Sequence, residues 1–220
     1  MKKLFVPIVA MATVLVFTSC NPEDKVAPEI TLPADALVID LGDETAALKG
    51  VTAKDDKDGD VTNSLKVAGL DFVGKGNLKY SAKDKSDNVG EAKRDVTIKA
   101  DKLFGTYFVE MVDQSDGSKV TYTVKAEAST ANTKVVITNF AGQSLSIAFE
   151  GDGKTTTLTT DKVYDLEYVD PVTHVKTAGH LTGTATYSIA GGVYSISACD
   201  FKIEWEDNST EVYKSTFSKR

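Results

Sequence analysis

The chain has 220 residues, with 32 acidic against 25 basic side chains, and its formal net charge is -7. An acidic chain without a basic run repels phosphate backbones, so nucleic acid is not an expected partner. The cysteines and histidines, which are Cys20, Cys199, His174 and His180, are too few for a disulfide framework or for the usual zinc sites of hydrolases.

The first segment of the chain is predicted to be an export signal. Two lysines precede an uncharged apolar run, Leu4 to Phe17, which is shorter than the roughly 18 to 20 residues that a membrane-spanning helix needs. The sequence Phe-Thr-Ser-Cys at 17–20 follows, and it resembles the lipobox of bacterial lipoproteins, with Phe17 where that family more often has Leu. The resemblance implies a signal peptide at residues 1–19 and acylation of Cys20.

Residues 20–26 are predicted to form a lipidated tether. Asn21 directly follows the cysteine, and Asn at this position resembles the pattern of lipoproteins that are passed on to the outer membrane. The pair Glu23-Asp24 is similar to the acidic tag of Bacteroidota-type lipoproteins displayed on the cell surface, although an ordinary polar tether has the same composition. The resemblance implies a lipid anchor in the outer membrane, with cell-surface display expected and periplasmic display as the alternative.

Short β-forming runs separated by Gly, Asp and Asn follow the tether and predict a small β-sandwich. The runs are residues 29–32, 36–39, 65–67, 78–82 and 96–98. Four motifs of this region resemble, in order and spacing, the bacterial Ig-like domain family known from pesticidal crystal and cell-surface proteins: APEITL at 27–32, GVTAKDDKDGDVT at 50–62, YSAKDKSDN at 80–88 and RDVTI at 94–98. The resemblance implies an Ig-like sandwich at residues 27–101 that serves as a spacer or binding module.

The stretch TAKDDKDGDVT at residues 52–62 has the composition of a calcium loop. An EF-hand alignment that starts at Asp56 puts Val61 where that loop needs Gly and Val67 where it needs Glu, so the EF-hand interpretation fails. The favoured interpretation is a turn in which aspartates accept hydrogen bonds from nearby N–H groups and Gly59 supplies a positive φ.

A different calcium geometry is the alternative for the same loop. It would combine Asp56, Asp58 and Asp60 with Asp84 or Asp87, provided that the two loops lie at the same end of the sandwich. Asp87 also stands where the D-x-x-G-N turn of the Ig-like family has Gly. Calcium is the only cofactor that the sequence suggests.

Longer runs that alternate polar and apolar residues occupy residues 102–220, for example 119–125, 144–149 and 181–187. Turn signals join them as hairpins: SDG at 115–117, GDG at 151–153, AGG at 190–192 and DNS at 207–209. About eight or nine antiparallel strands without a helix are predicted, and such a meander is best closed on itself. The expected fold class is therefore all-β, an Ig-like sandwich followed by a small lipocalin-like barrel, with an open meander sandwich as the alternative.

No catalytic site is expected in the barrel. Cys199 shares its strand face with Phe201 and Ile203, which predicts a buried, unreactive thiol. Neither histidine lies near a Gly-x-Ser-x-Gly elbow, and nothing singles out the carboxylate pair of a glycosidase, which is defined by distance in space. A change of apolar parity near residues 198–199 predicts a β-bulge.

The barrel is instead predicted to bind a ligand, and its candidate contacts are aromatic. Trp205 is the only tryptophan, and its neighbours in the strand favour a core role over a stacking platform, whereas Tyr164, Tyr168 and Tyr194 lie near loops. The two-part architecture resembles lipoproteins that accompany glycan-uptake systems in Bacteroidota-type outer membranes. That resemblance implies a non-enzymatic accessory protein that binds a polysaccharide or an outer-membrane transporter. The alternative is a structural or adhesive envelope protein without a small ligand.

Overall fold

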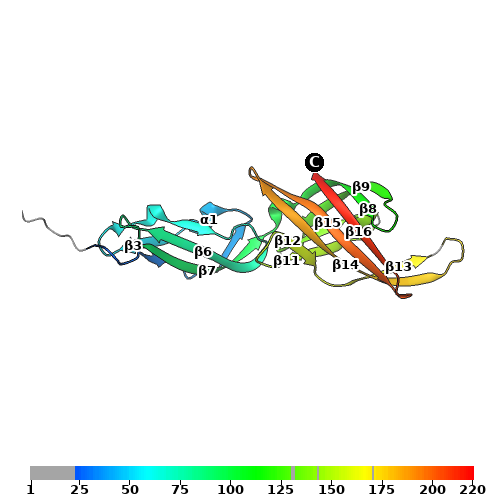
Figure 1. The fold of residues 1–220 in the computed structure, drawn as a ribbon, viewed down its shortest axis with the longest axis horizontal. Helices are drawn as coiled ribbons and strands as arrows, with labels where there is room; N and C mark the ends of the chain where they lie inside the picture. The colour runs from blue at the N-terminus through cyan, green and yellow to red at the C-terminus, as the bar shows by residue number, and fades with distance from the viewer. Residues whose placement is uncertain (1–22, 130–131, 143, 170) are drawn as a thin grey trace, which may run out of the picture.

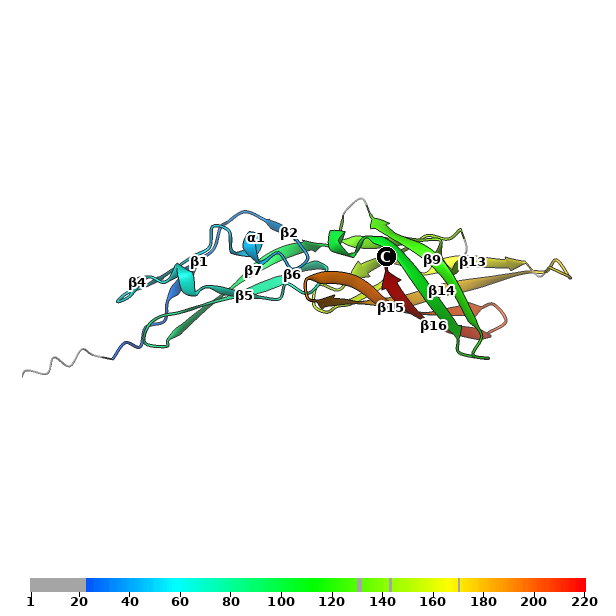
Figure 2. The same ribbon diagram turned by 90° about the horizontal axis from the view of Figure 1, so that it is seen from above.

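The computed structural model describes residues 23–129, 132–142, 144–169 and 171–220. The predicted signal peptide and Cys20 lie outside the described residues. The described chain is all-β and elongated, with two small sheets toward the N-terminus and a β-barrel toward the C-terminus (Figure 1; Figure 2). Within these ranges, no helix has the length and apolar composition to cross a membrane.

The two N-terminal sheets form a β-sandwich. One has the order β1-β3-β4 and the other β2-β7-β6-β5, and all neighbours are antiparallel except β2 and β7. Ala53 of the first sheet and Ala82 of the second belong to one buried cluster. The bounds are β1 Glu29–Thr31, β2 Leu37–Asp40, β3 Thr52–Asp55, β4 Gly59–Asp60, β5 Lys66–Ala68, β6 Gly74–Lys83 and β7 Val89–Lys99. The five runs predicted as strands lie in β1, β2, β5, β6 and β7.

A short helix in the sandwich was not predicted. Helix α1 spans Glu44–Leu48, and the Asp43 side chain caps its N-terminus by accepting a hydrogen bond from the Ala46 N–H at 2.9 Å. Ala47 is fully buried, and its carbonyl accepts a hydrogen bond from the Tyr80 hydroxyl at 3.0 Å. Five residues are too few for a helical hydrophobic period to be recognised in a sequence. The 3₁₀ turns η1 Thr62–Ser64 and η2 Asp101–Leu103 complete this part of the chain.

The C-terminal strands close into a barrel, as predicted. Eight strands, β8 to β12 and β14 to β16, follow one another as antiparallel neighbours, and the pairing of β12 with β14 closes the ring. Strand β13 pairs with the other end of β14 and lies outside this ring. The bounds are β8 Gly105–Asp113, β9 Lys119–Ala128, β10 Lys134–Thr138, η3 Phe140–Gly142, β11 Ile147–Gly151, β12 Thr157–Thr160, β13 Tyr164–Val169, β14 Lys176–Ala190, β15 Val193–Trp205 and β16 Thr210–Lys219.

The interior of the barrel is apolar because alternate residues of each strand point inward. Tyr107, Val109 and Met111 of β8 are buried in this way. The register between β14 and β15 shifts so that Ser197 has no direct partner, which confirms a β-bulge within a residue or two of the predicted position. The four predicted turns all connect hairpin strands.

The sandwich and the barrel meet end to end in a tight junction. The Gly153 N–H of the barrel donates to the Val73 carbonyl of the sandwich at 3.1 Å. The buried Tyr187 hydroxyl of the barrel donates to the Asp71 carbonyl at 2.9 Å. One buried apolar cluster continues from the sandwich into the barrel. This junction positions the two modules relative to each other.

Candidate functional site

A cavity of about 1010 Å³ lies at the end of the barrel remote from the sandwich. Strand β13 contributes to its wall, and Figure 1 shows β13 at the far end of the molecule from β3. Its floor consists of the inward-facing side chains Met111, Leu181, Phe201 and Ile203. The cavity is therefore the open mouth of the barrel interior.

Two of the four aromatic residues predicted to bind a ligand lie together in this mouth. Trp205 is half-buried at the end of β15, and the exposed Tyr168 of β13 packs edge-to-face against it, with 6.2 Å between ring centroids. Gly179 allows this arrangement, because a β-carbon there would lie 2.5 Å from an atom of the Trp205 ring. Trp205 is thus neither fully in the core nor a free platform: one part packs on the barrel and another faces the cavity.

The charged groups that line the mouth are carboxylates. Glu211 and Tyr213 line it from β16, and the Tyr213 hydroxyl donates to Glu211 Oε2 at 2.7 Å. Burial, with the neighbouring Glu211 carboxylate as a further cause, raises the pKa of the Tyr213 phenol, so it stays protonated. Glu167 and Asp207 add two more carboxylates. Among the described residues that line the cavity, none is Lys, Arg or His.

The other two predicted aromatic residues have structural roles elsewhere. The Tyr164 hydroxyl accepts a hydrogen bond from the Ala148 N–H at 2.7 Å and donates to Asp161 at 2.8 Å. Tyr194 lies at the junction, where its hydroxyl approaches the backbone of Gly42. These two residues are thus outside the mouth cavity, and proximity to a loop in sequence did not place them there.

The Cys199 thiol is buried, as the sequence predicted, and both histidines lie on the β13–β14 hairpin. Cys199 is 1% exposed, and burial raises the pKa of its thiol. His180 pairs with Asp165 at 2.9 Å on the exposed side of the β13–β14 hairpin. His174 has a positive φ of 57° in the turn of that hairpin.

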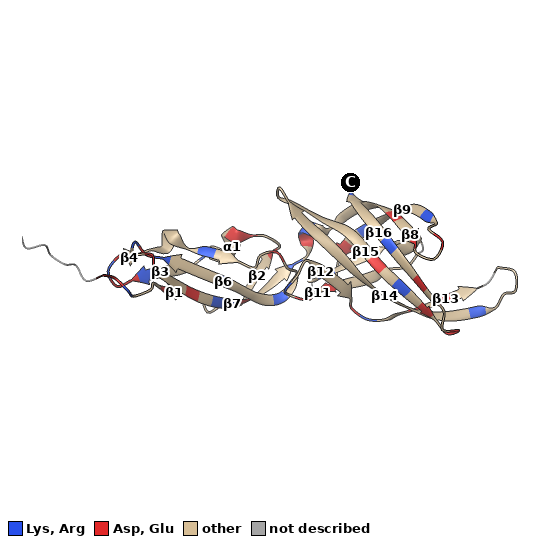
Figure 3. Ribbon diagram, in the orientation of Figure 1, with Lys and Arg blue, Asp and Glu red and all other residues tan. Residues whose placement is uncertain are grey.

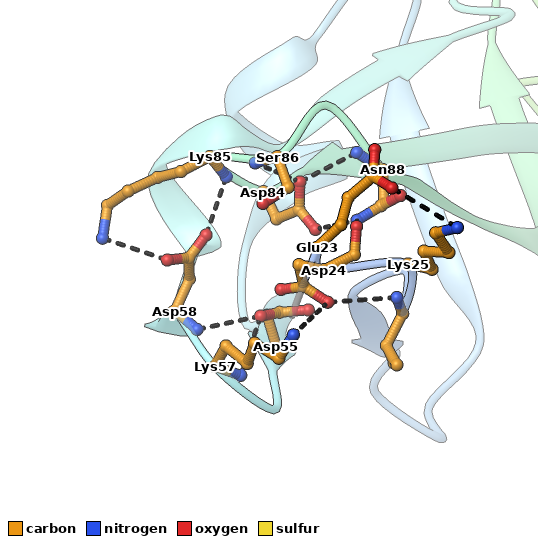
Figure 4. A network of polar contacts seen from close by, with 11 residues as sticks. Glu23, Asp24, Lys25, Asp55, Lys57, Asp58, Asp84, Lys85, Ser86 and Asn88 are labelled. Carbon is orange, nitrogen blue, oxygen red and sulfur yellow. Dashed lines mark hydrogen bonds and ion pairs between the residues drawn. The ribbon is translucent and has the colours of Figure 1, made fainter. Parts of the chain in front are cut away.

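The aspartate-rich loop and the turn after β6 lie at the same end of the sandwich, which is the condition set for a calcium geometry. The Asp58 carboxylate joins them, since it accepts a hydrogen bond from the Lys85 N–H at 2.7 Å and pairs with the Lys85 ammonium at 3.2 Å (Figure 4). Asp56, Asp60 and Asp87 are exposed on these loops. Asp60 accepts from the Thr62 N–H, and Asp87 pairs with Lys83.

A different set of carboxylates is buried between the loops. Asp24, Asp55 and Asp84 are 8%, 7% and 6% exposed, and one carboxylate oxygen from each lies within 4.8 Å of the others. Only Asp84 belongs to the predicted set. The alternating pattern that begins at Asp56 does not include Asp55, and Asp24 lies in the predicted tether. Figure 3 shows charged residues of both signs at this end of the molecule.

Comparisons with known proteins give little for this chain. No protein-family model matches the sequence, and no curated protein matches it significantly. The crystal structure of the lipoprotein BT2262 from Bacteroides thetaiotaomicron aligns over 86% of this chain and 99% of that chain, with 15% sequence identity and a TM-score of 0.25. A likeness of this size does not establish a shared fold or function.

Proposed function

We propose that the protein is a lipid-anchored, non-enzymatic envelope protein whose barrel mouth binds a neutral glycan. The observation that carries this proposal is the lining of the mouth cavity: an edge-to-face aromatic pair, Trp205 and Tyr168, beside carboxylates. The apolar face of a sugar ring stacks on aromatic side chains, and carboxylates accept hydrogen bonds from its hydroxyl groups. The size of the cavity is at the upper end of the usual range for small-molecule sites.

The charge of the cavity favours a neutral glycan over an acidic one. Glu167, Asp207 and Glu211 repel a negatively charged ligand, and no basic side chain among the described lining residues offsets them. Glu211 already has a donor in the Tyr213 hydroxyl, so it is oriented before a ligand arrives.

The arrangement of the modules supports a spacer role for the sandwich. The described chain begins at the sandwich end, and β13, which contributes to the cavity wall, lies at the opposite end of the molecule (Figure 1). If Cys20 carries the lipid in the outer membrane, the cavity is held away from the bilayer. The tight junction keeps that separation, because it restricts bending between the modules.

Tryptophan fluorescence is a direct test, because Trp205 is the only tryptophan. The mature protein, residues 20–220, is titrated with neutral and with acidic polysaccharides, and binding in the mouth should change the emission of Trp205 for the neutral set. Calorimetry then compares Trp205→Ala and Trp205→Phe. The alanine variant should weaken binding by at least about tenfold, whereas phenylalanine should retain part of it.

A matched control is Phe108→Ala, since Phe108 is 37% exposed on the outer face of the barrel and does not line the cavity. Equal affinities of Trp205→Ala and Phe108→Ala would place the glycan elsewhere. Failure to bind any glycan, together with co-purification of an envelope protein, would favour the adhesive alternative. Release of shorter sugars from the bound glycan would overturn the non-enzymatic assignment.

A further inference from the structure

The three buried carboxylates between the sandwich loops carry more negative charge than the described side chains around them balance. Lys57 supplies one ammonium, whose Nζ lies 3.6 Å from Asp24 Oδ1. Three carboxylates and one ammonium leave two formal negative charges in the group formed by Asp24, Asp55 and Asp84. Burying unbalanced charge is costly. One divalent cation would neutralise the group.

The Asp55 side chain is the observation that points to a ligand. Its Oδ1 accepts hydrogen bonds from the N–H groups of Lys57 at 3.0 Å and Asp58 at 2.8 Å. Its Oδ2 is buried and has no hydrogen-bond partner among the described residues. Figure 4 shows the Asp55 carboxylate beside that of Asp24, with Asp84 close by. A buried carboxylate oxygen without a donor calls for a cation or a bound water.

The backbone fixes the carboxylates before any ligand binds. Asp84 Oδ1 accepts from the N–H groups of Ser86 and Asn88, both at 2.8 Å, and Oδ2 accepts from the Asn88 side-chain amide at 2.8 Å. The same amide donates to the Asp24 carbonyl at 3.1 Å. These bonds leave acceptor capacity on the carboxylates, because each oxygen has more than one lone pair.

We propose that Asp24, Asp55 and Asp84 bind a calcium ion. The group offers only oxygen atoms, which are the preferred ligands of hard cations, whereas zinc and copper sites usually include nitrogen or sulfur ligands. Water would complete the six to eight oxygens that calcium takes. Calcium is favoured over magnesium because carboxylates from three separate chain segments suit its longer and less regular coordination.

The ion would fasten the start of the described chain to the sandwich. Asp24 lies in the tether, Asp55 ends β3, and Asp84 follows β6, so one ion would join all three segments. Asp24 comes four positions after Cys20 in the sequence. If Cys20 carries a lipid, fastening the tether would also orient the sandwich relative to the membrane. That effect rests on the proposed lipid anchor, whereas calcium binding itself does not.

Thermal melting and calorimetry with calcium alone test the site in the mature protein, residues 20–220. With an affinity typical of extracellular modules, 10 mM calcium should raise the melting temperature by about 3–10 °C relative to a chelator. Asp55→Asn keeps an oxygen for the two N–H donors but removes the charge, and it should weaken calcium binding at least about tenfold. Asp56→Asn, the exposed neighbouring carboxylate, is the matched control and should bind calcium like the wild type.

Two further variants keep the test decisive. If Asp55→Asn does not fold, Asp24→Asn removes a ligand while both sandwich loops stay intact, and it should also abolish the calcium shift. Lys57→Met removes the competing ammonium and should tighten calcium binding. A wild-type melting temperature unchanged by calcium, or an equal shift in wild type and Asp55→Asn, would overturn the proposal: the first result means that Lys57 or water satisfies the carboxylates, and the second means unspecific screening.

Discussion

The two ends of the molecule differ in how they are built. At the sandwich end, Asp55 and Asp84 are held by N–H groups within four residues of each of them in the chain. At the barrel end, the mouth cavity brings together Tyr168, Trp205 and Glu211 from three different strands. At the first end local turns fix the two loop carboxylates, whereas the cavity at the second end exists only because the barrel closes.

The difference shows which kind of site a short motif can encode. A turn in which a carboxylate accepts hydrogen bonds from neighbouring backbone N–H groups keeps its geometry independently of distant parts of the fold. The acidic group is therefore expected to tolerate changes in the barrel. The mouth cavity depends on strand register and on the β13–β14 pairing, so it is expected to be sensitive to packing changes in the barrel wall.

Gly153→Ala at the junction should have the largest effect. A β-carbon on Gly153, whose φ is 71°, would lie 1.7 Å from the Lys75 carbonyl oxygen, which is backbone and has little room to move. The free energy of unfolding should fall by about 4 kcal/mol, measured by denaturant unfolding. Gly117→Ala is the control: its φ is 75° and nothing lies within 4 Å, so only the cost of the backbone conformation, about 1 kcal/mol, remains. Similar losses in both variants would mean that the junction is loose.

Asp84→Ala should lower the free energy of unfolding by about 3 kcal/mol in the presence of a chelator. The variant leaves the N–H groups of Ser86 and Asn88 and the Asn88 amide without their acceptor in a part-buried site. Urea unfolding of the variant and of Asp60→Ala measures the effect, since Asp60 accepts one exposed backbone bond and should lose much less. If the two variants lose equally, the turns are not held by their own hydrogen bonds.

Gly179→Ala should disturb the barrel end while the sandwich end stays intact. The new methyl group meets the Trp205 ring, so the ring must shift away from its place beside Tyr168. We expect about 1–2 kcal/mol of destabilisation and a shifted tryptophan emission maximum, with any calcium response unchanged. Gly191→Ala, where nothing lies within 4 Å, should leave the emission maximum at its wild-type position. An unchanged emission maximum in Gly179→Ala would show that the ring has room to spare.

Acid should weaken the sandwich end through Asp58. The hydrogen bond from the Lys85 N–H is the largest cause that lowers the pKa of the Asp58 carboxyl below its usual 3.8. Since the folded pKa is depressed, the stabilisation is present above pH 3.8 and is lost as the pH falls through the folded pKa. Melting temperatures measured from neutral pH to below this value should therefore fall less steeply for Asp58→Asn than for the wild type. A curve for Asp58→Asn identical to that of the wild type would contradict the assignment.

Alternation and turn chemistry predicted most of the fold, because both are local properties of a strand and of its ends. Residues 119–125 alternate and form part of β9, and the change of parity predicted a bulge near residues 198–199, which the structure has at Ser197. Helix α1 was missed although Asp43 and the positive-φ Gly50 stand where a cap and a stop signal belong, because the helix between them has only five residues. Turn residues are informative only when the element between them is long enough to show a period.

The sites were predicted less completely, for a physical reason that differs between the ends. Asp84 was among the candidate metal ligands and lies in the buried group, but Asp24 comes from 31 positions before Asp55 in the chain, and only the packed tether brings it there. At the barrel end, Tyr168 and Trp205 were candidates because of their aromatic type, and both line the cavity, whereas Glu211 was not a candidate, because its inward direction depends on the register of β16. Residues far apart in sequence become neighbours only when the chain packs and the barrel closes, and a single sequence does not show which distant residues will meet.

Asp87→Gly is expected to have the smallest effect and the opposite sign. Asp87 has a φ of 70°, a left-handed backbone conformation in which a β-carbon is unfavourable and glycine is preferred. The loss of the exposed pair with Lys83 costs little, and the greater freedom of glycine in the unfolded chain offsets part of the gain. We expect a net stabilisation of about 0.5 kcal/mol, measured by thermal and urea unfolding. The control is Asp116→Gly, in an exposed turn where the residue does not have a positive φ. This variant should instead destabilise the protein by a similar amount, because glycine relieves no strain there and the Ser118 N–H loses its acceptor. Equal signs for the two variants would mean that the conformation at Asp87 carries no strain, and that the local turn at the sandwich end accommodates Asp as readily as Gly.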